Sequence, residues 1–177
     1  MKNRMGLYLS QIQAVDIALC LMFNRTSQRD WIREFFCVIS RLGNGLFWYA
    51  VMLGTLLYDR QDGVVPCLHM MGAGLAGTLL YKGIKVRASR PRPSEVSMAI
   101  SPGLPPLDQF SFPSGHTLHA VVFSMVALSY YPMLSWLLIP FTMLTAISRL
   151  VLGLHYPTDV LAGAVLGVFI ASLSFML

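Results

Sequence analysis

Charged side chains are scarce in this chain. They make up 12% of its 177 residues, whereas 55% of the residues are hydrophobic and the mean hydropathy is +0.62. Such a composition excludes an ordinary soluble domain, in which about 25% of residues are charged, and it indicates an integral membrane protein. We expect one domain that covers residues 1–177.

Cysteine is also scarce. Cys20, Cys37 and Cys67 are odd in number and lie far apart among apolar residues. The sequence therefore predicts neither a disulfide framework nor a zinc site. We expect no metal and no cofactor.

Basic residues outnumber acidic ones, thirteen to eight, which gives a net charge of +5. An excess of this sign is typical of proteins that meet nucleic acid, anionic lipid or an anionic substrate. The basic residues lie in short loops between apolar stretches, without the interleaved aromatic residues of a single-strand binder. We therefore expect the lipid bilayer and an anionic lipid as partners, and no nucleic acid.

Six apolar stretches predict an all-α, membrane-embedded helical bundle with about six transmembrane helices. They are residues 7–23, 42–58, 64–82, 117–131, 133–152 and 159–177. Asp16 and three other polar residues make the first stretch amphipathic, so a helix along the membrane interface is the alternative there. Residues 30–40 have an amphipathic pattern as well. The fourth stretch is short, about 22 Å against a hydrocarbon core of about 30 Å.

Three polar clusters interrupt this apolar pattern. They are Lys85–Pro93 (KVRASRPRP), Pro113–His116 (PSGH) and Ser148–Asp159 (SRLVLGLHYPTD). Because the chain crosses the membrane twice between the second and third clusters, counting spans places all three on one face. Ionisable groups at membrane depth are costly when unpaired, so their convergence indicates a shared anionic ligand.

Two histidines and a carboxylate in these clusters suit phosphoryl transfer. His155 and Asp159 are four residues apart, and a helix that begins near Thr158 would bring the carboxylate within reach of the imidazole. Nδ1 would then stay protonated and Nε2 would be free to attack phosphorus, which gives a phosphohistidine. His116 is available as the general acid for the leaving oxygen.

Fixed cations and backbone N–H groups would stabilise the phosphoryl group. We expect Lys85, Arg92 and Arg149 to supply the charges, and Ser114 and Gly115 to supply N–H groups where an apolar helix begins. Each cluster alone has a structural alternative. These are a helix N-cap at Ser114, a structural His–Asp pair, and a patch of cations for lipid headgroups.

The glycines and the remaining histidines have simpler interpretations. Gly72, Gly74 and Gly77 have GxGxxG spacing, but no strand precedes them, so close helix packing is favoured over a dinucleotide loop. His119 is expected to line the pocket or to pack, and His69 to lie in the interior or at the interface. No carboxylate or cysteine near His116 and His119 completes a metal site.

In order and spacing, the three clusters resemble the signature of the type 2 phosphatidic acid phosphatases, which share their active-site pattern with the vanadium haloperoxidases. The family pattern is Lys, six residues, Arg-Pro; then Pro-Ser-Gly-His; then Ser-Arg, five residues, His, three residues, Asp. The matching positions are Lys85, Arg92, Pro93, Pro113, Ser114, Gly115, His116, Ser148, Arg149, His155 and Asp159. The matching segment is residues 82–160.

The resemblance implies a metal-independent phosphatase with six membrane helices. His155 would be the nucleophile, Asp159 would orient it and His116 would be the acid. The residues that would bind the phosphate are Lys85, Arg92, Ser114, Gly115 and Arg149. Arg90 is a weaker candidate for an additional contact.

A site at the membrane boundary favours a lipid phosphate as substrate. Candidates are a polyprenyl diphosphate such as undecaprenyl diphosphate, phosphatidylglycerol phosphate, phosphatidic acid and a lipid A phosphate, with residues 94–112 in contact with the headgroup. The alternative is a membrane module without catalysis that binds or transports anionic lipid.

The sequence gives two different indications of sidedness. The resemblance implies a bacterial inner membrane with the active site facing the periplasm or outside. That face would carry all of the thirteen basic residues except Lys2, Arg4 and Arg60. The positive-inside rule places such a face in the cytoplasm.

Overall fold

The computed structural model describes residues 2–60 and 62–176, and within these ranges it is helical, without strands. Its α-helices are α1 (Lys2–Thr26), α2 (Asp30–Arg41), α3 (Phe47–Asp59), α4 (Val64–Ala88), α5 (Pro93–Val96), α6 (Gly115–Tyr130), α7 (Ser135–Val151) and α8 (Pro157–Ser174). A π-helical turn at Leu42–Leu46 joins α2 to α3, and a 3-10 turn at Pro132–Leu134 precedes α7. The expected all-α fold is confirmed.

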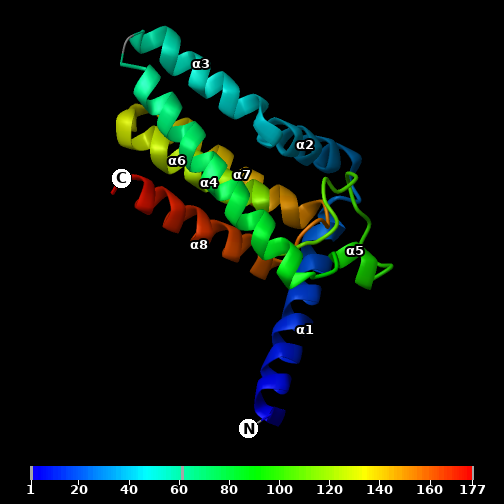
Figure 1. Ribbon diagram of the computed structural model, residues 1–177. Coiled ribbons are helices and arrows are strands. Elements are labelled where there is room, and N and C mark those ends of the chain that lie inside the picture. The colour runs from blue at the N-terminus through cyan, green and yellow to red at the C-terminus, as the bar shows by residue number, and fades with distance from the viewer. Residues whose placement is uncertain (1, 61, 177) are drawn as a thin grey trace.

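The six apolar stretches correspond to α1, α3, α4, α6, α7 and α8. By length and composition, five segments of the described chain could cross a membrane: α1 from Gly6, α2 with α3, α4 with the residues up to Val96, α7 with the turn before it, and α8. α6 has only 16 residues, but it packs against α4, α7 and α8 (Figure 1). Leu118, Ala120 and Val122 of α6 are fully buried. Because neighbouring helices cover α6, its short length causes little mismatch with lipid.

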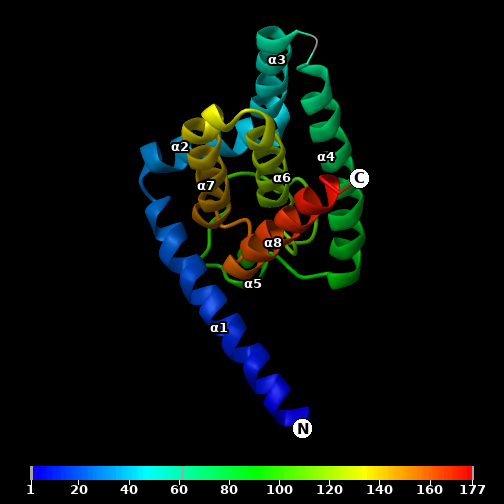
Figure 2. The same cartoon turned by 90° about the vertical axis from the view of Figure 1, so that its left-hand side faces the viewer.

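The two N-terminal helices lie differently from the rest. The C-terminal half of α1 packs against α7 and α8, while its N-terminal half extends away from the bundle, beyond the end that carries α5 (Figures 1 and 2). α2 is amphipathic, as expected: the charged Arg33 and Glu34 are exposed, whereas Phe36 is partly buried and Ile39 is buried. Gly45 in the π-helical turn has φ of +134°, a conformation that favours glycine, and the chain changes direction there.

Small residues allow α6 and α8 to approach closely. A Cβ atom at Gly163 would lie 2.5 Å from the carbonyl oxygen of Ser114, and one at Gly167 would lie 2.8 Å from that of Leu118. Gly74 of α4 similarly faces the ring of Phe123 on α6. The packing role expected for Gly74 and Gly77 is confirmed, whereas a Cβ atom at Gly72 would meet nothing within 4 Å, so the expectation was wrong there.

Alternating helix directions bring the three polar clusters together. α4 and α7 end at the same end of the bundle where α6 and α8 begin (Figure 1). α4 continues to Ala88, so the first part of the basic cluster is helical, and an irregular segment containing α5 connects it to α6. The predicted convergence on one face is confirmed.

Candidate active site

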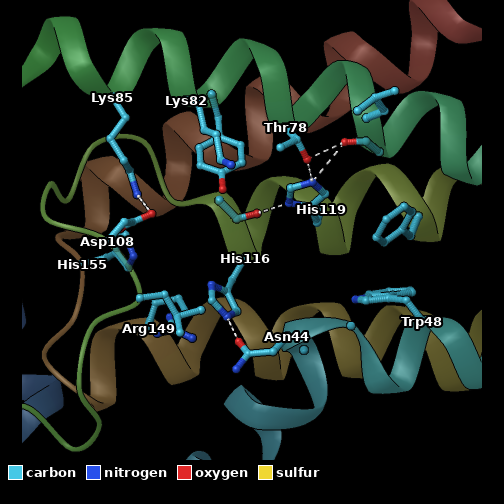
Figure 3. Close-up of a pocket in the computed structure, with 18 of the residues that line it drawn as sticks. Asn44, Trp48, Thr78, Lys82, Lys85, Asp108, His116, His119, Arg149 and His155 are labelled. Carbon is cyan, nitrogen blue, oxygen red and sulfur yellow. Dashed lines mark hydrogen bonds and ion pairs between the residues drawn. The ribbon is translucent and has the colours of Figure 1, made fainter.

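A cavity of about 600 Å³ opens at this end of the bundle. Six of the eight candidate site residues line it: Lys85, Arg92, Gly115, His116, Arg149 and His155. Figure 3 shows Lys85, His116, Arg149 and His155 around one end of the cavity and Trp48 at the other. Asp159 and Ser114 lie behind this lining and are fully buried.

The first turn of α8 holds the expected histidine and carboxylate pair. The helix begins at Pro157, one residue earlier than expected, and Asp159 Oδ2 accepts a hydrogen bond of 2.9 Å from the N–H of Tyr156. His155 Nδ1 lies 3.7 Å from the same oxygen, an ion-pair distance rather than a hydrogen bond. Among the residues that the structure describes, this nitrogen has no hydrogen-bond partner.

His155 lies in the turn between α7 and α8 and is 3% exposed. Burial lowers the pKa of its imidazole to about 4, and the positive charges of Arg149 and Arg92 act in the same direction against the partial compensation by Asp159. The imidazole is therefore neutral at pH 7, the state that a nucleophile requires.

A carboxylate that the sequence did not single out lies between two of the predicted cations. Asp108 Oδ2 is 2.7 Å from Lys85 Nζ, and Asp108 Oδ1 is 2.6 Å from Arg92 Nη2. Both cations are almost completely buried, whereas the Asp108 side chain is 38% exposed. The two cations thus point at one acidic group in the cavity (Figure 3 for Lys85).

The two arginines are anchored by other parts of the chain. Arg92 Nη1 donates to the carbonyl of Leu154 at 2.6 Å, which connects the loop to the turn that carries His155. Arg149 Nη1 donates to the hydroxyl of Ser40 on α2 at 2.7 Å. Arg149 Nε is buried and has no partner among the described residues, so this guanidinium has a donor left for an anion.

His116 is held by a residue that no motif marks. Its Nε2 is hydrogen-bonded to Oδ1 of Asn44, which lies in the π-helical turn before Gly45 (Figure 3). One turn further along α6, His119 Nδ1 donates to the carbonyl of Gly115 at 2.8 Å, and His119 also lines the cavity. The expectation for His119 is confirmed.

Ser114 connects the second cluster to the third. Its N–H donates to the carbonyl of Asp159 at 3.0 Å, and its hydroxyl is 3.0 Å from that of Thr117. Ser114 occupies the N-cap position of α6 without a capping side-chain bond. The N–H of Ser114 is thus engaged in joining α6 to α8, while Gly115 faces the cavity.

Arg90 does not make the contact that the sequence suggested for it. It is absent from the cavity lining and instead donates to Asp159 Oδ1 at 2.6 Å and to Asp16 Oδ2 at 2.7 Å. The sequence around Arg90 does not predict these contacts, because both partners are distant in sequence.

The described residues contain no group of three or more His, Cys, Asp or Glu side chains that could hold a metal ion. The three cysteines are free, and two of them, Cys20 and Cys67, are buried. The polar side chains that line the cavity are histidines, cations, Asp108, Asn44, Thr78 and two tyrosines, Tyr49 and Tyr81.

Comparison with known proteins identifies the family. Residues 64–177 match the sequence model of the PAP2 superfamily. The chain belongs to the PAP2 superfamily. Undecaprenyl-diphosphatase BcrC of Bacillus subtilis (strain 168) is 31% identical over 125 residues, which are 71% of this chain and 64% of that protein. This PAP2 chain thus spans slightly less than two thirds of that relative's length.

Solved structures share the fold of this PAP2 chain. The crystal structure of the first transmembrane PAP2 type phosphatidylglycerolphosphate phosphatase from Bacillus subtilis has a TM-score of 0.75 and 28% identity, and it covers 94% of this chain and 85% of that chain. LpxE of Aquifex aeolicus has a TM-score of 0.78 and 23% identity, over 92% and 96% of the two chains. The first of these structures supports the assignment of the chain as an integral membrane PAP2 protein.

Proposed function

We propose that this PAP2 protein is a lipid phosphatase that hydrolyses a lipid phosphate monoester or diphosphate through a phosphohistidine intermediate. One observation carries the proposal: the buried His155, with its Nδ1 3.7 Å from Asp159, shares a cavity with Lys85, Arg92 and Arg149. A binding module needs the cations but neither the histidine nor its carboxylate.

In the first step, the three cations bind the equatorial oxygens of the phosphoryl group. His155 Nε2 attacks phosphorus, and the bond from phosphorus to the lipid oxygen breaks as the new N–P bond forms. The negative charge of the bound phosphoryl group favours the protonated form of His116, which then gives its proton to the leaving lipid oxygen. Asp159 stabilises the positive charge that develops on the imidazole of His155.

In the second step, water attacks the phosphohistidine. His116, now without its proton, accepts one from the water, and the N–P bond breaks. Inorganic phosphate leaves, and His155 and His116 return to their starting states.

The cavity has two chemically different ends, which suits a phosphorylated lipid. Beyond the cations it is lined by apolar side chains that include Trp48, Met52 and Phe123. Its volume lies within the range of about 300–1,000 Å³ for small-molecule sites. A headgroup at the cations and the first carbons of a lipid tail at the aromatic end fit this division (Figure 3 for Trp48).

Two of the similar proteins are named for undecaprenyl diphosphate and phosphatidylglycerolphosphate. We propose these two lipids as the first candidate substrates, with phosphatidic acid and lipid A phosphate completing the panel. The test is phosphate release by the purified full-length chain in detergent, with a chelator present.

We expect turnover by the wild type and a loss of at least about 10⁴-fold in His155→Ala, because loss of a nucleophile removes the covalent route. His69→Ala is the matched control, since His69 lies at the opposite end of the bundle and bonds Tyr130 and Ser174. Full activity of His155→Ala would refute the mechanism. Lipid binding without turnover by the wild type would favour the non-catalytic module.

We also propose that the protein resides in a bacterial inner membrane with the cavity facing the periplasm, as the family resemblance implies. Met98→Cys introduces a thiol at a fully exposed position of the loop near the cavity, and Asp62→Cys introduces one in the turn at the opposite end. A membrane-impermeant maleimide applied to intact cells should label the first variant and not the second, above the wild-type background. The reverse pattern would place the cavity in the cytoplasm.

A further inference from the structure

Asp16 is a buried charge on a helix that is otherwise mostly exposed. Its side chain is 2% exposed, whereas those of Ile12 and Val15 are 50% and 58% exposed. A buried carboxylate costs several kcal/mol unless charged and hydrogen-bonding partners compensate it. The partners of Asp16 lie on two other segments, the loop after α4 and the start of α8.

These partners form a closed network. Asp16 Oδ2 accepts a hydrogen bond of 2.7 Å from Arg90 Nη2, and Asp16 Oδ1 accepts one of 3.2 Å from the N–H of Thr158. The Thr158 hydroxyl donates to Asp16 Oδ2 and accepts from Arg90 Nη1 at 2.8 Å. α1 is thereby fixed to the helix turn that carries Asp159.

Arg90 connects this network to the proposed active site. Its Nη1 also donates to Asp159 Oδ1 at 2.6 Å, and its guanidinium carbon lies 3.9 Å from the centre of the Tyr156 ring. The other oxygen of Asp159 accepts from the N–H of Tyr156 and faces His155 Nδ1. One oxygen of Asp159 therefore bonds Arg90, and the other bonds the N–H of Tyr156 and faces the proposed nucleophile.

We infer that Asp16, acting through Arg90, is a positioning residue for the catalytic carboxylate Asp159. The inference rests on the proposed function, and it concerns a residue outside the segment 64–177 that matches the family. With Asp16 ionised, Arg90 divides its positive charge between two carboxylates and stays in one orientation.

Neutralising Asp16 would leave Arg90 paired with Asp159 alone. Asp159 would then have less negative charge available to stabilise the imidazole cation in the transition state. The cations that bind the phosphate would be unchanged. The effect is thus expected in kcat and not in KM.

Asp16→Asn in the full-length chain, assayed in detergent on the lipid that the wild type turns over best, should lower kcat about 10-fold, as partners of functional side chains commonly do. KM should stay at the wild-type value. Asp16→Glu, which keeps the charge, should recover part of the loss. Ile17→Ala is the control, because it loosens the packing of α1 on Ile100 and Tyr156 without removing a charge.

A double-mutant cycle separates positioning from general stability. In the Asp159→Asn background, Asp16→Asn should cause no further loss of kcat, because the group that it positions has lost its charge. A loss of equal size in both backgrounds, or an equal loss in Ile17→Ala, would overturn the inference. So would an unchanged kcat in Asp16→Asn.

Folding is monitored by circular dichroism and gel filtration in detergent. If Asp16→Asn does not fold, Thr158→Val tests the same network by removing the hydroxyl that Asp16 and Arg90 share. It should lower kcat at constant KM, and an unchanged kcat would overturn the inference. Wild-type turnover with unaffected variants refutes only this inference, whereas a wild type without turnover refutes the proposed function and the inference with it.

Discussion

The parts of the chain before and after residue 64 contribute different kinds of groups to the same cavity. Residues 64–177, which match the family, carry all the side chains that we assign to the chemistry. The earlier residues carry uncharged or acidic groups that bond to two of these side chains and to Arg90, which in turn bonds Asp159. The pairs are Asp16 with Arg90, Ser40 with Arg149, and Asn44 with His116.

This division shows that the family signature is held in place only in part by its own segment of the chain. Long buried side chains such as Arg149 need hydrogen-bond partners to keep one orientation. Here α1, α2 and the turn after α2 provide them. A change in the first part of the chain can therefore alter the chemistry without touching a signature residue.

The pH profile tests whether the second part of the chain, residues 64–177, alone sets the protonation state of His155, the proposed nucleophile. Burial, Arg149, Arg92 and Asp159 determine the lowered pKa of His155, about 4, and all three residues lie in that part. The imidazole is neutral and active above this pKa, so on the acid side of the profile kcat/KM should fall only as the pH drops through about 4. An imidazole with a pKa of about 6.5 would already have lost about 30-fold at pH 5.

The measurement is kcat/KM from pH 3.5 to pH 8 on the wild type, with circular dichroism at each pH to exclude unfolding. A midpoint near pH 6.5 would mean that the cations and burial do not act on His155 as the geometry indicates. The residues of the second part would then not control the protonation state of His155, and the division of roles between the two parts would be wrong.

Asn44→Ala tests a partner from the first part. Asn44 fixes His116, the proposed general acid, so its loss should lower kcat about 10-fold on a lipid phosphate, whose alkoxide is a poor leaving group. Turnover of p-nitrophenyl phosphate should change little, because its leaving group needs no proton. Both activities are measured on the same purified protein.

Leu46→Ala serves as the control for Asn44→Ala, since Leu46 lies in the same turn and is 66% exposed. It should leave both activities near wild type. Equal losses of Asn44→Ala on the two substrates would contradict a role in proton transfer and indicate a general effect on the site.

The sequence predicts the parts of this molecule that depend on local pattern. Apolar runs predict the helices, and counting the spans between the polar clusters predicts that the clusters converge on one face. Asn44 and His116 are 72 positions apart, and Asp16 and Arg90 are 74 apart. No local pattern marks such pairs, and Asp16 therefore looked like part of the polar face of an interfacial helix.

The sequence also cannot predict which backbone N–H groups at the start of α6 are free to bind phosphate. Ser114 and Gly115 both begin α6, and both were expected to offer N–H groups to phosphate. The structure directs the N–H of Ser114 to the carbonyl of Asp159, because Gly163 lets α8 come close at that point. Which N–H groups of a helix start are free depends on the neighbouring helix.

Asp108→Asn tests a partner from the second part of the chain. Asp108 lies in the same part as the two cations that it bonds. The Asp108 carboxylate bonds Lys85 and Arg92, and an incoming phosphate competes for the same donors. Removing its charge should strengthen inhibition by inorganic phosphate about 3-fold, a small effect because a pair with a partner 38% exposed is screened by solvent.

The inhibition constant of inorganic phosphate, measured against turnover, checks this prediction. Glu95→Gln is the matched control: Glu95 lies in the same loop and accepts from the backbone N–H of Arg92 at 3.0 Å, not from its guanidinium, so the constant should not change. If Asp108→Asn instead weakens inhibition, the carboxylate orients the cations for phosphate and does not compete with it. Asp108 would then belong with Asp16 and Asn44, as a group that holds the site in place.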